Sequence, residues 1–241
     1  MYKIYPSVLN AYQHYLNSEV DAEAFTNLTP DGYYRQSADE IAQARLDALL
    51  NTINRVPVTS EAMERGTAFN LLIDRLLANE TIETDGKVCE IVSDGKRWSF
   101  DAETCRRTAQ YLGGSLAQVY QEREIDTELG KVLLYGYADY VQRERIIDLK
   151  TTARYQFGKY EQGWQRYVYT YILAQDMRVE SFTYLAVQMK TVDGVHCGSL
   201  YAEDYTTTAA DTQILKAFLC RFIEFLEQHR SQITDLKILG E

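Results

Sequence analysis

Three charged residues in the middle of the chain, Asp139, Asp148 and Lys150, have the types and the spacing of a small catalytic centre. The residues around them predict two antiparallel strands joined by a turn at Arg143-Glu144. A hairpin with this turn places Asp139 directly opposite Asp148. Side chains two residues apart on a strand share a face, so Lys150 is expected on the same side as both aspartates.

Two opposed carboxylates need a reason to lie together. Like charges directly opposite each other in a sheet are destabilising, and burial of both raises the pKa of one. A divalent cation between them removes the conflict, and oxygen ligands of this kind suit Mg²⁺ or Mn²⁺. A lysine beside the ion can lower the pKa of an attacking water or stabilise charge that develops on phosphorus. The arrangement predicts phosphodiester hydrolysis; the alternative, a hairpin face in solvent, is disfavoured by the apolar residues around both aspartates.

Three motifs follow one another in this region: Gly136-x-x-Asp139, then Ile147-Asp148-x-Lys150-Thr151, then Gln165-x-x-x-Tyr169. In order and spacing they resemble the RecB-like, phage-type exonuclease branch of the PD-(D/E)XK nucleases, over roughly residues 60–175. The resemblance implies an α/β (α+β) fold, a restriction-endonuclease-like core with a central mixed sheet flanked by helices. It also implies hydrolysis of DNA or RNA phosphodiesters with Mg²⁺ or Mn²⁺.

The resemblance implies a role for each matching residue. Asp139 and Asp148 would bind the metal together with the backbone carbonyl of Leu149, and Lys150 would be the catalytic lysine. Gln165 and Tyr169 lie one helical turn apart and would help to place the lysine or the DNA. The alternative for that pair is a polar face on an amphipathic helix.

Some positions depart from the family pattern or match it weakly. Asn70 stands in Gly66-Thr67-x-x-Asn70, where many relatives have a histidine ligand, and its neutral amide oxygen is a weaker ligand than a carboxylate. Glu124 precedes the hairpin in a strand-like segment and either faces the metal or holds a basic side chain. Thr151 adjoins the lysine and is a further candidate. Ser7 resembles the opening segment of the family, or simply caps the first helix.

Cations and aromatic residues alternate after the second motif. The cations Arg154, Lys159 and Arg166 could hold phosphates. The aromatic residues interleaved with them are Tyr155, Phe157, Tyr160, Trp164 and Tyr167. Such a pattern suits an unpaired strand or a frayed end, but the chain has 19 tyrosines, and plain packing explains the rings equally well.

Composition limits the possible functions. The net charge of −10 argues against a protein that coats nucleic acid. No apolar run approaches the roughly 20 residues that span a bilayer, and the N-terminus has no signal-peptide pattern, so we expect no membrane association and a cytoplasmic location.

The four cysteines form no C-x-x-C pair, which predicts packing roles and no iron–sulfur cluster. No phosphate-binding glycine loop occurs, so we expect no nucleotide cofactor.

The resulting functional hypothesis is a stand-alone, metal-dependent deoxyribonuclease. We expect an exonuclease of the phage recombination type that acts on linear or single-stranded DNA ends, with a recombination protein as a possible partner. An endonuclease of the same fold is the first alternative. A nucleic-acid-binding protein with impaired catalysis is the second.

The pattern of apolar residues predicts a single domain over residues 1–241. Its core covers about residues 60–200, a helical elaboration precedes it at 1–59, and a C-terminal helix lies within 203–241. Helices are expected at 7–16, 38–53, from Ser60 to about 78, 104–121, 161–174 and 209–229. Strands are expected in an 88–100 hairpin and at 131–141, 145–151, 181–191 and 195–201, and a loop at 27–35.

Overall fold

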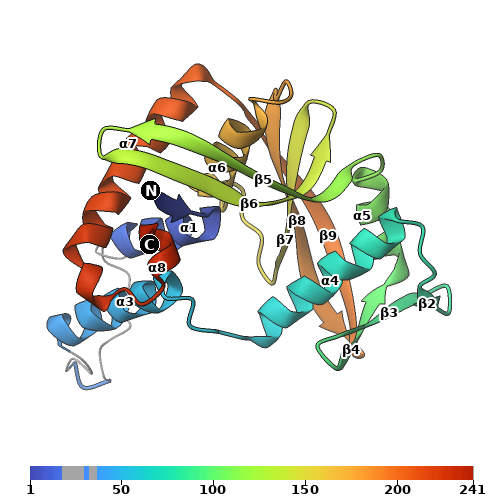
Figure 1. Cartoon of the computed structure of the whole chain (residues 1–241). Coiled ribbons are helices and arrows are strands. Elements are labelled where there is room, and N and C mark those ends of the chain that lie inside the picture. The colour runs from blue at the N-terminus through green and yellow to red at the C-terminus, as the bar shows by residue number, and fades with distance from the viewer. Residues whose placement is uncertain (18–29, 33–36, 241) are drawn as a thin grey trace.

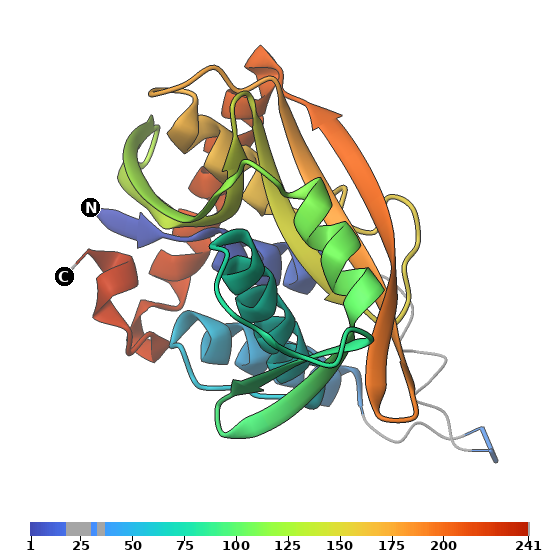
Figure 2. The same cartoon turned by 90° about the vertical axis from the view of Figure 1, so that its right-hand side faces the viewer.

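A mixed sheet forms the centre of the protein, and helices cover both of its faces (Figures 1 and 2). The structure, a computed structural model, describes residues 1–17, 30–32 and 37–240. This architecture confirms the predicted mixed α/β class with a central sheet flanked by helices. No helix in the described ranges is long and apolar enough to cross a membrane.

The described residues form a nine-stranded sheet. Its strands are β1 (Tyr2–Ile4), β2 (Glu83–Thr84), β3 (Val88–Ser93), β4 (Lys96–Asp101), β5 (Leu116–Thr127), β6 (Gly130–Gln142), β7 (Arg145–Thr152), β8 (Ser181–Val192) and β9 (Val195–Thr206). Their order is β1-β6-β7-β8-β9-β4-β3-β2, and β5 pairs with the other edge of β6. The β7–β8 pair is parallel and is flanked by antiparallel pairs, so the centre of the sheet is mixed.

Two large hydrophobic clusters hold most of the buried residues of the helices. The helices are α1 (Pro6–Asn17), α3 (Ala38–Ile53), α4 (Glu61–Leu77), α5 (Ala102–Tyr111), α6 (Trp164–Leu173), α7 (Ala209–Gln228), the 3-10 helix η1 (Arg230–Gln232) and α8 (Leu236–Leu239). One cluster joins α4 and α5 to β3, β4 and the adjacent strands. The other joins α1, α3, α6, α7 and α8 to β1, β5 and β6.

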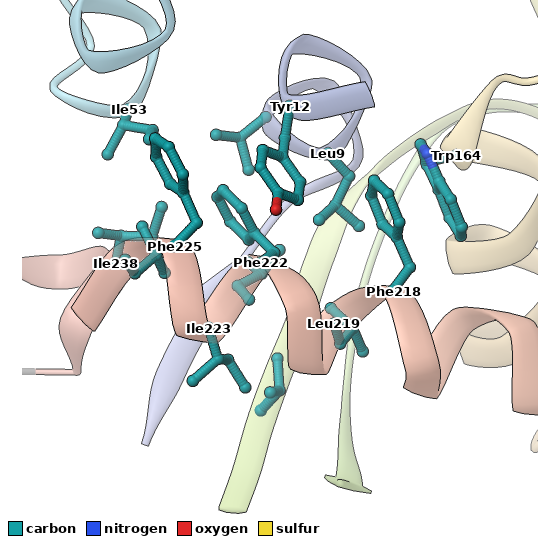
Figure 3. Packing of buried hydrophobic residues seen from close by; sticks show 14 of the residues in the cluster. Leu9, Tyr12, Ile53, Trp164, Phe218, Leu219, Phe222, Ile223, Phe225 and Ile238 are labelled. Atoms are coloured by element: carbon teal, nitrogen blue, oxygen red, sulfur yellow. The ribbon is translucent and has the colours of Figure 1, made fainter. Parts of the chain in front are cut away.

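The second cluster is built around α7, whose apolar residues recur with helical spacing. Figure 3 shows Phe218, Phe222 and Phe225 on the side of α7 that faces α1, with Phe225 beside Ile53 of α3 and Phe218 beside Trp164 of α6. The Tyr12 ring lies 5.0–5.4 Å from all three phenylalanine rings. α1 and α7 therefore share one core although they lie near opposite ends of the chain, and each large apolar side chain buried there contributes about 1.5–3 kcal/mol.

Most predicted elements are confirmed to within a few residues, and the largest error lies after α5. A helix is predicted from residue 104 to about 121, but α5 ends at Tyr111 and β5 begins at Leu116. Gly114 has a φ of +78°, a left-handed conformation that ends the helix. β9 runs five residues past its predicted end, and β1, β2 and α8 are not predicted. Of the expected 27–35 loop, only residues 30–32 lie inside the described ranges, where they form a turn.

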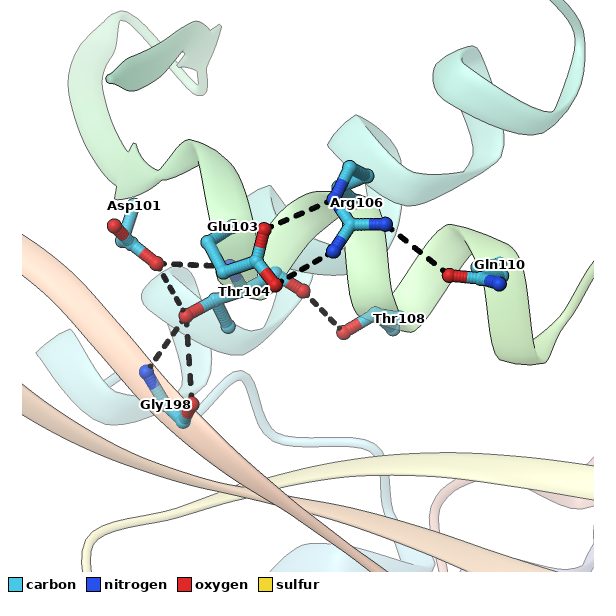
Figure 4. Close-up of polar contacts among 7 residues, drawn as sticks. All are labelled: Asp101, Glu103, Thr104, Arg106, Thr108, Gln110 and Gly198. Carbon is cyan, nitrogen blue, oxygen red and sulfur yellow. Dashed lines mark hydrogen bonds and ion pairs between the residues drawn. The ribbon is translucent and has the colours of Figure 1, made fainter.

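A short polar network fixes α5 to the sheet (Figure 4). Asp101 caps the helix by accepting from the backbone N–H and the hydroxyl of Thr104, both at 2.8 Å. The Thr104 hydroxyl oxygen also accepts from the backbone N–H of Gly198 in β9 at 3.0 Å. Gly198 is needed here, because a Cβ would lie 2.6 Å from Val187.

We expect Thr104→Val to destabilise the protein by about 1–3 kcal/mol, because the Gly198 N–H loses its acceptor while the side chain keeps its shape. Thr108→Val is the matched control: the Thr108 hydroxyl donates only to the Thr104 carbonyl within the same helix, so its loss should cost less than about 1 kcal/mol. Urea unfolding of both variants measures the difference. Equal losses would show that the contact between α5 and β9 adds nothing.

Candidate active site

The two strands of the predicted hairpin separate at the position of Asp139 and Asp148. Their ladder has the predicted register, with Val141 opposite Ile146, but it ends at the Tyr140–Ile147 pair. Farther along the same edge of β6, β1 takes the place of β7 and pairs with residues 132–134. β6 and β7 thus form a fork, and Asp139 is the first residue of β6 inside it.

Asp139 also lies at a break in the other ladder of β6. The β5–β6 register passes from Ala117–Tyr140 to Val119–Ala138 and omits the pair that Gln118 and Asp139 would form. Gln118 has a φ of +50°. Residues two apart on a strand normally share a face. Tyr140, however, packs in the cluster that joins α4 and α5 to β3 and β4, whereas Ala138 packs with residues of α6. The usual alternation of faces is therefore broken at Asp139.

The expectation that Asp139 lies directly opposite Asp148 in a continuous ladder is therefore wrong. A carboxylate oxygen of Asp139 instead accepts a hydrogen bond from the backbone N–H of Leu149 at 3.0 Å. The N–H and C=O of one strand residue point to the same side. The Leu149 carbonyl is therefore also turned toward the fork, where it was expected to serve as a ligand.

Asp148 and Lys150 share one face of β7, as predicted. Asp148 is only 2 % exposed. The ammonium nitrogen of Lys150 lies 2.7 Å from Asp148 Oδ2, and the lysine side chain is 27 % exposed. A buried carboxylate thus holds a lysine whose side chain is still partly accessible.

The local electrostatics follow from this crowding. Burial raises the pKa of Asp139 to about 7, and the charge of Asp148 acts in the same direction. Burial opposes the charge on Lys150, but Asp148 and Asp139 outweigh it and raise the pKa of the lysine above its ordinary value. The resulting group is a charged lysine beside two carboxylates that repel each other.

The glycine of the first motif and the tyrosine of the third motif are in contact. A Cβ on Gly136 would lie 2.9 Å from the Tyr169 hydroxyl and 3.1 Å from its ring. Tyr169 is buried on α6, and the nearby aspartates, after burial itself, raise the pKa of its hydroxyl. Gln165, one turn earlier, accepts from the Asn10 amide of α1 at 3.4 Å. The structure thus brings both α6 candidates to the same region as the fork.

α4 approaches the fork from the other face of the sheet. A Cβ on Gly66 would lie 2.8 Å from the Thr151 hydroxyl, so a larger residue at position 66 would force Thr151 or the helix to shift. Between them is a cleft of about 370 Å³, and Asn70, Leu149, Lys150 and Thr151 are among its lining residues. The Asn70 amide oxygen is buried and has no hydrogen-bond partner. We call this the α4 cleft.

Other candidates lie farther from the fork. Glu124 is ion-paired with Lys131 at 2.9 Å, six positions along the β5–β6 ladder from Asp139. Arg166 stacks over the rings of Tyr167 and Tyr205. Arg154 is exposed on the loop after β7. Only Lys159 of the three expected phosphate-binding cations lines a cleft that Lys150 also lines.

The aromatic residues of this region divide between packing and exposure. Trp164 stacks on Phe218 with ring centroids 3.7 Å apart, and Tyr155 stacks on Tyr201 at 4.2 Å. Tyr160 lines the cleft beside Lys150, while Phe157 is 83 % exposed. The pattern of alternating rings therefore does not correspond to one continuous surface.

Two residues near the site were not predicted from the sequence. Asp74 lies one helical turn after Asn70, accepts from the Tyr140 hydroxyl at 2.6 Å, and has a pKa that burial raises. Asn10 of α1 accepts from the backbone N–H of Trp164 at 2.6 Å and so caps α6. The i, i+4 spacing from Asn70 could have indicated Asp74, whereas no local signal connects Asn10 to a helix that starts at residue 164.

The fold agrees with the family comparison. The chain belongs to the PD-(D/E)XK nuclease superfamily, whose sequence model matches residues 35–235. Comparison with curated proteins gives no match. The solved structure titled "Crystal structure of SSO0001" superposes with a TM-score of 0.45 at 11 % identity, over 91 % of this chain and 76 % of that one. Membership implies phosphodiester hydrolysis in a nucleic acid and, typically, a divalent metal, and leaves the branch within the superfamily open.

The residues at the fork fit a hard divalent cation. In the described ranges, no group of three or more His, Cys, Asp or Glu is arranged to hold a metal. The available donors are therefore the two aspartates and neutral oxygens, namely the Leu149 carbonyl and the partnerless amide oxygen of Asn70. Carboxylate, carbonyl and amide oxygens suit Mg²⁺ or Mn²⁺.

We expect Gly136→Ala to cost about 1–3 kcal/mol of stability, because the added methyl group collides with the Tyr169 ring and hydroxyl. Tyr169→Phe removes the hydroxyl, so the double variant should recover part of the loss, with a coupling of at least about 0.5 kcal/mol. Denaturant unfolding of the four proteins measures it. Strict additivity would mean that the two motif positions are not in contact.

The metal-free protein should lose stability as the pH rises. The pKa of Asp139 is about 7 in the folded protein and 3.8 when unperturbed. Well below pH 3.8 the carboxyl group is neutral in both the folded and the unfolded state, so it has no effect on stability. Above pH 7 it is charged in both states, and the buried charge destabilises the folded state in full. Asp139→Asn stays neutral and should remove this loss, which exceeds roughly 1 kcal/mol because each pKa unit is worth about 1.4 kcal/mol. Thermal unfolding in EDTA across this range gives the comparison. Parallel curves for the two proteins would contradict the raised pKa.

Proposed function

We propose that this protein is a Mg²⁺- or Mn²⁺-dependent deoxyribonuclease with Asp139, Asp148 and Lys150 at its centre. The observation that carries the proposal is the fork between β6 and β7. The Lys150 ammonium group pairs there with the buried Asp148, and Lys150 lines a cleft together with Asn70, whose amide oxygen is buried without a hydrogen-bond partner. Superfamily membership supplies the reaction class.

Each residue has a chemical task in this proposal. Asp139, Asp148, Asn70 and the Leu149 carbonyl would hold the cation, which supplies Lewis acidity and a more acidic bound water. The Lys150 ammonium group, fixed by Asp148, is placed to stabilise negative charge on a phosphoryl oxygen. Water loses one proton as its oxygen bonds to phosphorus, the bond from phosphorus to one ester oxygen breaks, and the leaving alkoxide takes up one proton.

We further propose exonuclease action at linear or single-stranded ends, in a recombination context with a partner protein. The size of the clefts on the two sides of Lys150 supports a single strand: about 370 and 410 Å³, in the range of pockets for small molecules. An endonuclease of the same fold is the alternative, because both clefts are open to solvent. Cleavage assays separate these activities when they compare linear DNA, circular single-stranded DNA and nicked circular DNA. A matched RNA strand tests whether the sugar matters. Loss of linear DNA alone supports an exonuclease, and cut circles support an endonuclease.

Asp148→Ala and Lys150→Ala should each lower cleavage of linear DNA at least about 100-fold, since the first removes a carboxylate ligand of the cation and the second removes the positive charge beside the reacting phosphate. Cleavage with Mn²⁺ is followed on gels, and thermal unfolding checks the fold. The control is Lys190→Ala, which removes an exposed lysine near the C-terminal end of β8. Near wild-type rates in a folded Lys150→Ala protein would disprove the site. Retained DNA binding without cleavage in the wild type would instead support an impaired nuclease.

A further inference from the structure

α1 has one apolar face and one polar face along its whole length. Its apolar face, with Val8, Leu9 and Tyr12, is buried in the core. On the other side, polar residues recur three or four positions apart, which is the spacing of one helix face. They are Ser7, Asn10, His14 and Asn17. The family match begins at residue 35, so it gives α1 no role.

The polar face of α1 forms one wall of a cleft of about 410 Å³, which we call the α1 cleft. The loop before α6 and the first residues of α6 form the opposite wall. Lys150 lines the α1 cleft and also the α4 cleft. A ligand in the α1 cleft would therefore reach the catalytic lysine from the side away from Asn70.

The lining of the α1 cleft differs in charge from the protein as a whole. Its described residues include Lys150, Lys159 and His14, and none of them is acidic, in a chain of net charge −10. The other polar lining groups are mostly side-chain amides: Asn10, Gln13, Asn17, Gln162 and Gln165. Cations bind phosphate oxygens, and amides bind phosphate, sugar and base edges, so this chemistry matches a nucleic-acid strand. Tyr160 adds a ring on which a base could stack.

Part of this amide network has a structural task that must be kept apart from binding. Asn10 caps α6, and the Asn17 amide donates to Gln162 Oε1 at 2.7 Å, which joins α1 to the opposite wall. Lys159 donates to the Thr152 hydroxyl at 2.6 Å and holds the loop after β7. His14 is exposed and lies in the last turn of α1, so it can be changed with little effect on the fold.

We propose that the α1 cleft binds one unpaired strand of the nucleic acid beside the scissile phosphate, with His14 next to the path of the phosphates. The volume accommodates roughly one or two nucleotides of a single strand. This inference rests on the nuclease function proposed above. It adds a strand-binding surface on a helix that carries none of the catalytic motifs.

The test places charge at residue 14 and compares it with the same charge elsewhere. His14→Lys should tighten binding of a fluorescein-labelled 12-nucleotide oligothymidine, and His14→Glu should weaken it, by roughly three- to tenfold each, the size of effect expected when a single phosphate interaction is added or removed. The matched controls are Gln213→Lys and Gln213→Glu, at an exposed amide on α7 that lies outside the cleft. They change the net charge equally and should leave binding within twofold of the wild type.

Two readouts separate this proposal from the nuclease proposal. Fluorescence anisotropy in EDTA measures binding even if the wild type cleaves nothing. In Mn²⁺, the His14 variants should shift KM for the oligonucleotide with little change in kcat. His14→Lys should also neutralise one more phosphate, so the slope of log Kd against log salt concentration should become steeper by about 0.7. Equal effects at residues 14 and 213, or none at 14, would overturn the α1 cleft as a strand site. The same response with a blunt 12-base-pair duplex would overturn the preference for a single strand.

Discussion

The separation of β6 from β7 after the Tyr140–Ile147 pair is the constraint on which the rest of the site depends. Strand backbones that part leave N–H and C=O groups without partners, and buried groups of this kind must be satisfied. Asp139 supplies one such partner by accepting from Leu149. This hydrogen bond explains the position of Asp139 in the fold without any metal. The same opening turns the Leu149 carbonyl toward the place where an ion would lie.

The hairpin itself could be predicted from the sequence, because its turn and its apolar strands are local features. The end of its ladder could not, since it depends on β1, a three-residue strand about 130 positions earlier in the chain. The prediction that Lys150 and Asp148 share a face was correct. The prediction that Asp139 lies opposite Asp148 was wrong, because it assumed that the β6–β7 ladder continues past Tyr140 and Ile147. The helix predicted across residues 112–121 failed for a related reason: β5 takes its conformation from pairing with β6, which overrides local helix propensity.

The three sequence motifs describe contacts as well as chemistry. Gly136 is glycine because Tyr169 occupies the space of its side chain, and Gly66 is glycine because Thr151 does the same on the other face. The motifs of β6 and α6, 30 residues apart, are therefore one packed unit. The N-terminal helices are also more than an elaboration. α1 shares a core with α7 and caps α6 through Asn10, so the helix that carries Gln165 and Tyr169 is held partly from outside the catalytic motifs.

β5 is a twelve-residue strand that, among the described strands, pairs only with β6. A long strand with one free edge is a template on which a second copy could add a strand and begin to aggregate. The break at Gln118 interrupts this template, and the charged residues Glu122, Glu124 and Asp126 follow it on alternate positions. Two copies aligned edge to edge would bring these carboxylates together. The break in the β5–β6 ladder beside Asp139 therefore also helps to protect the protein from self-association through the free edge of β5.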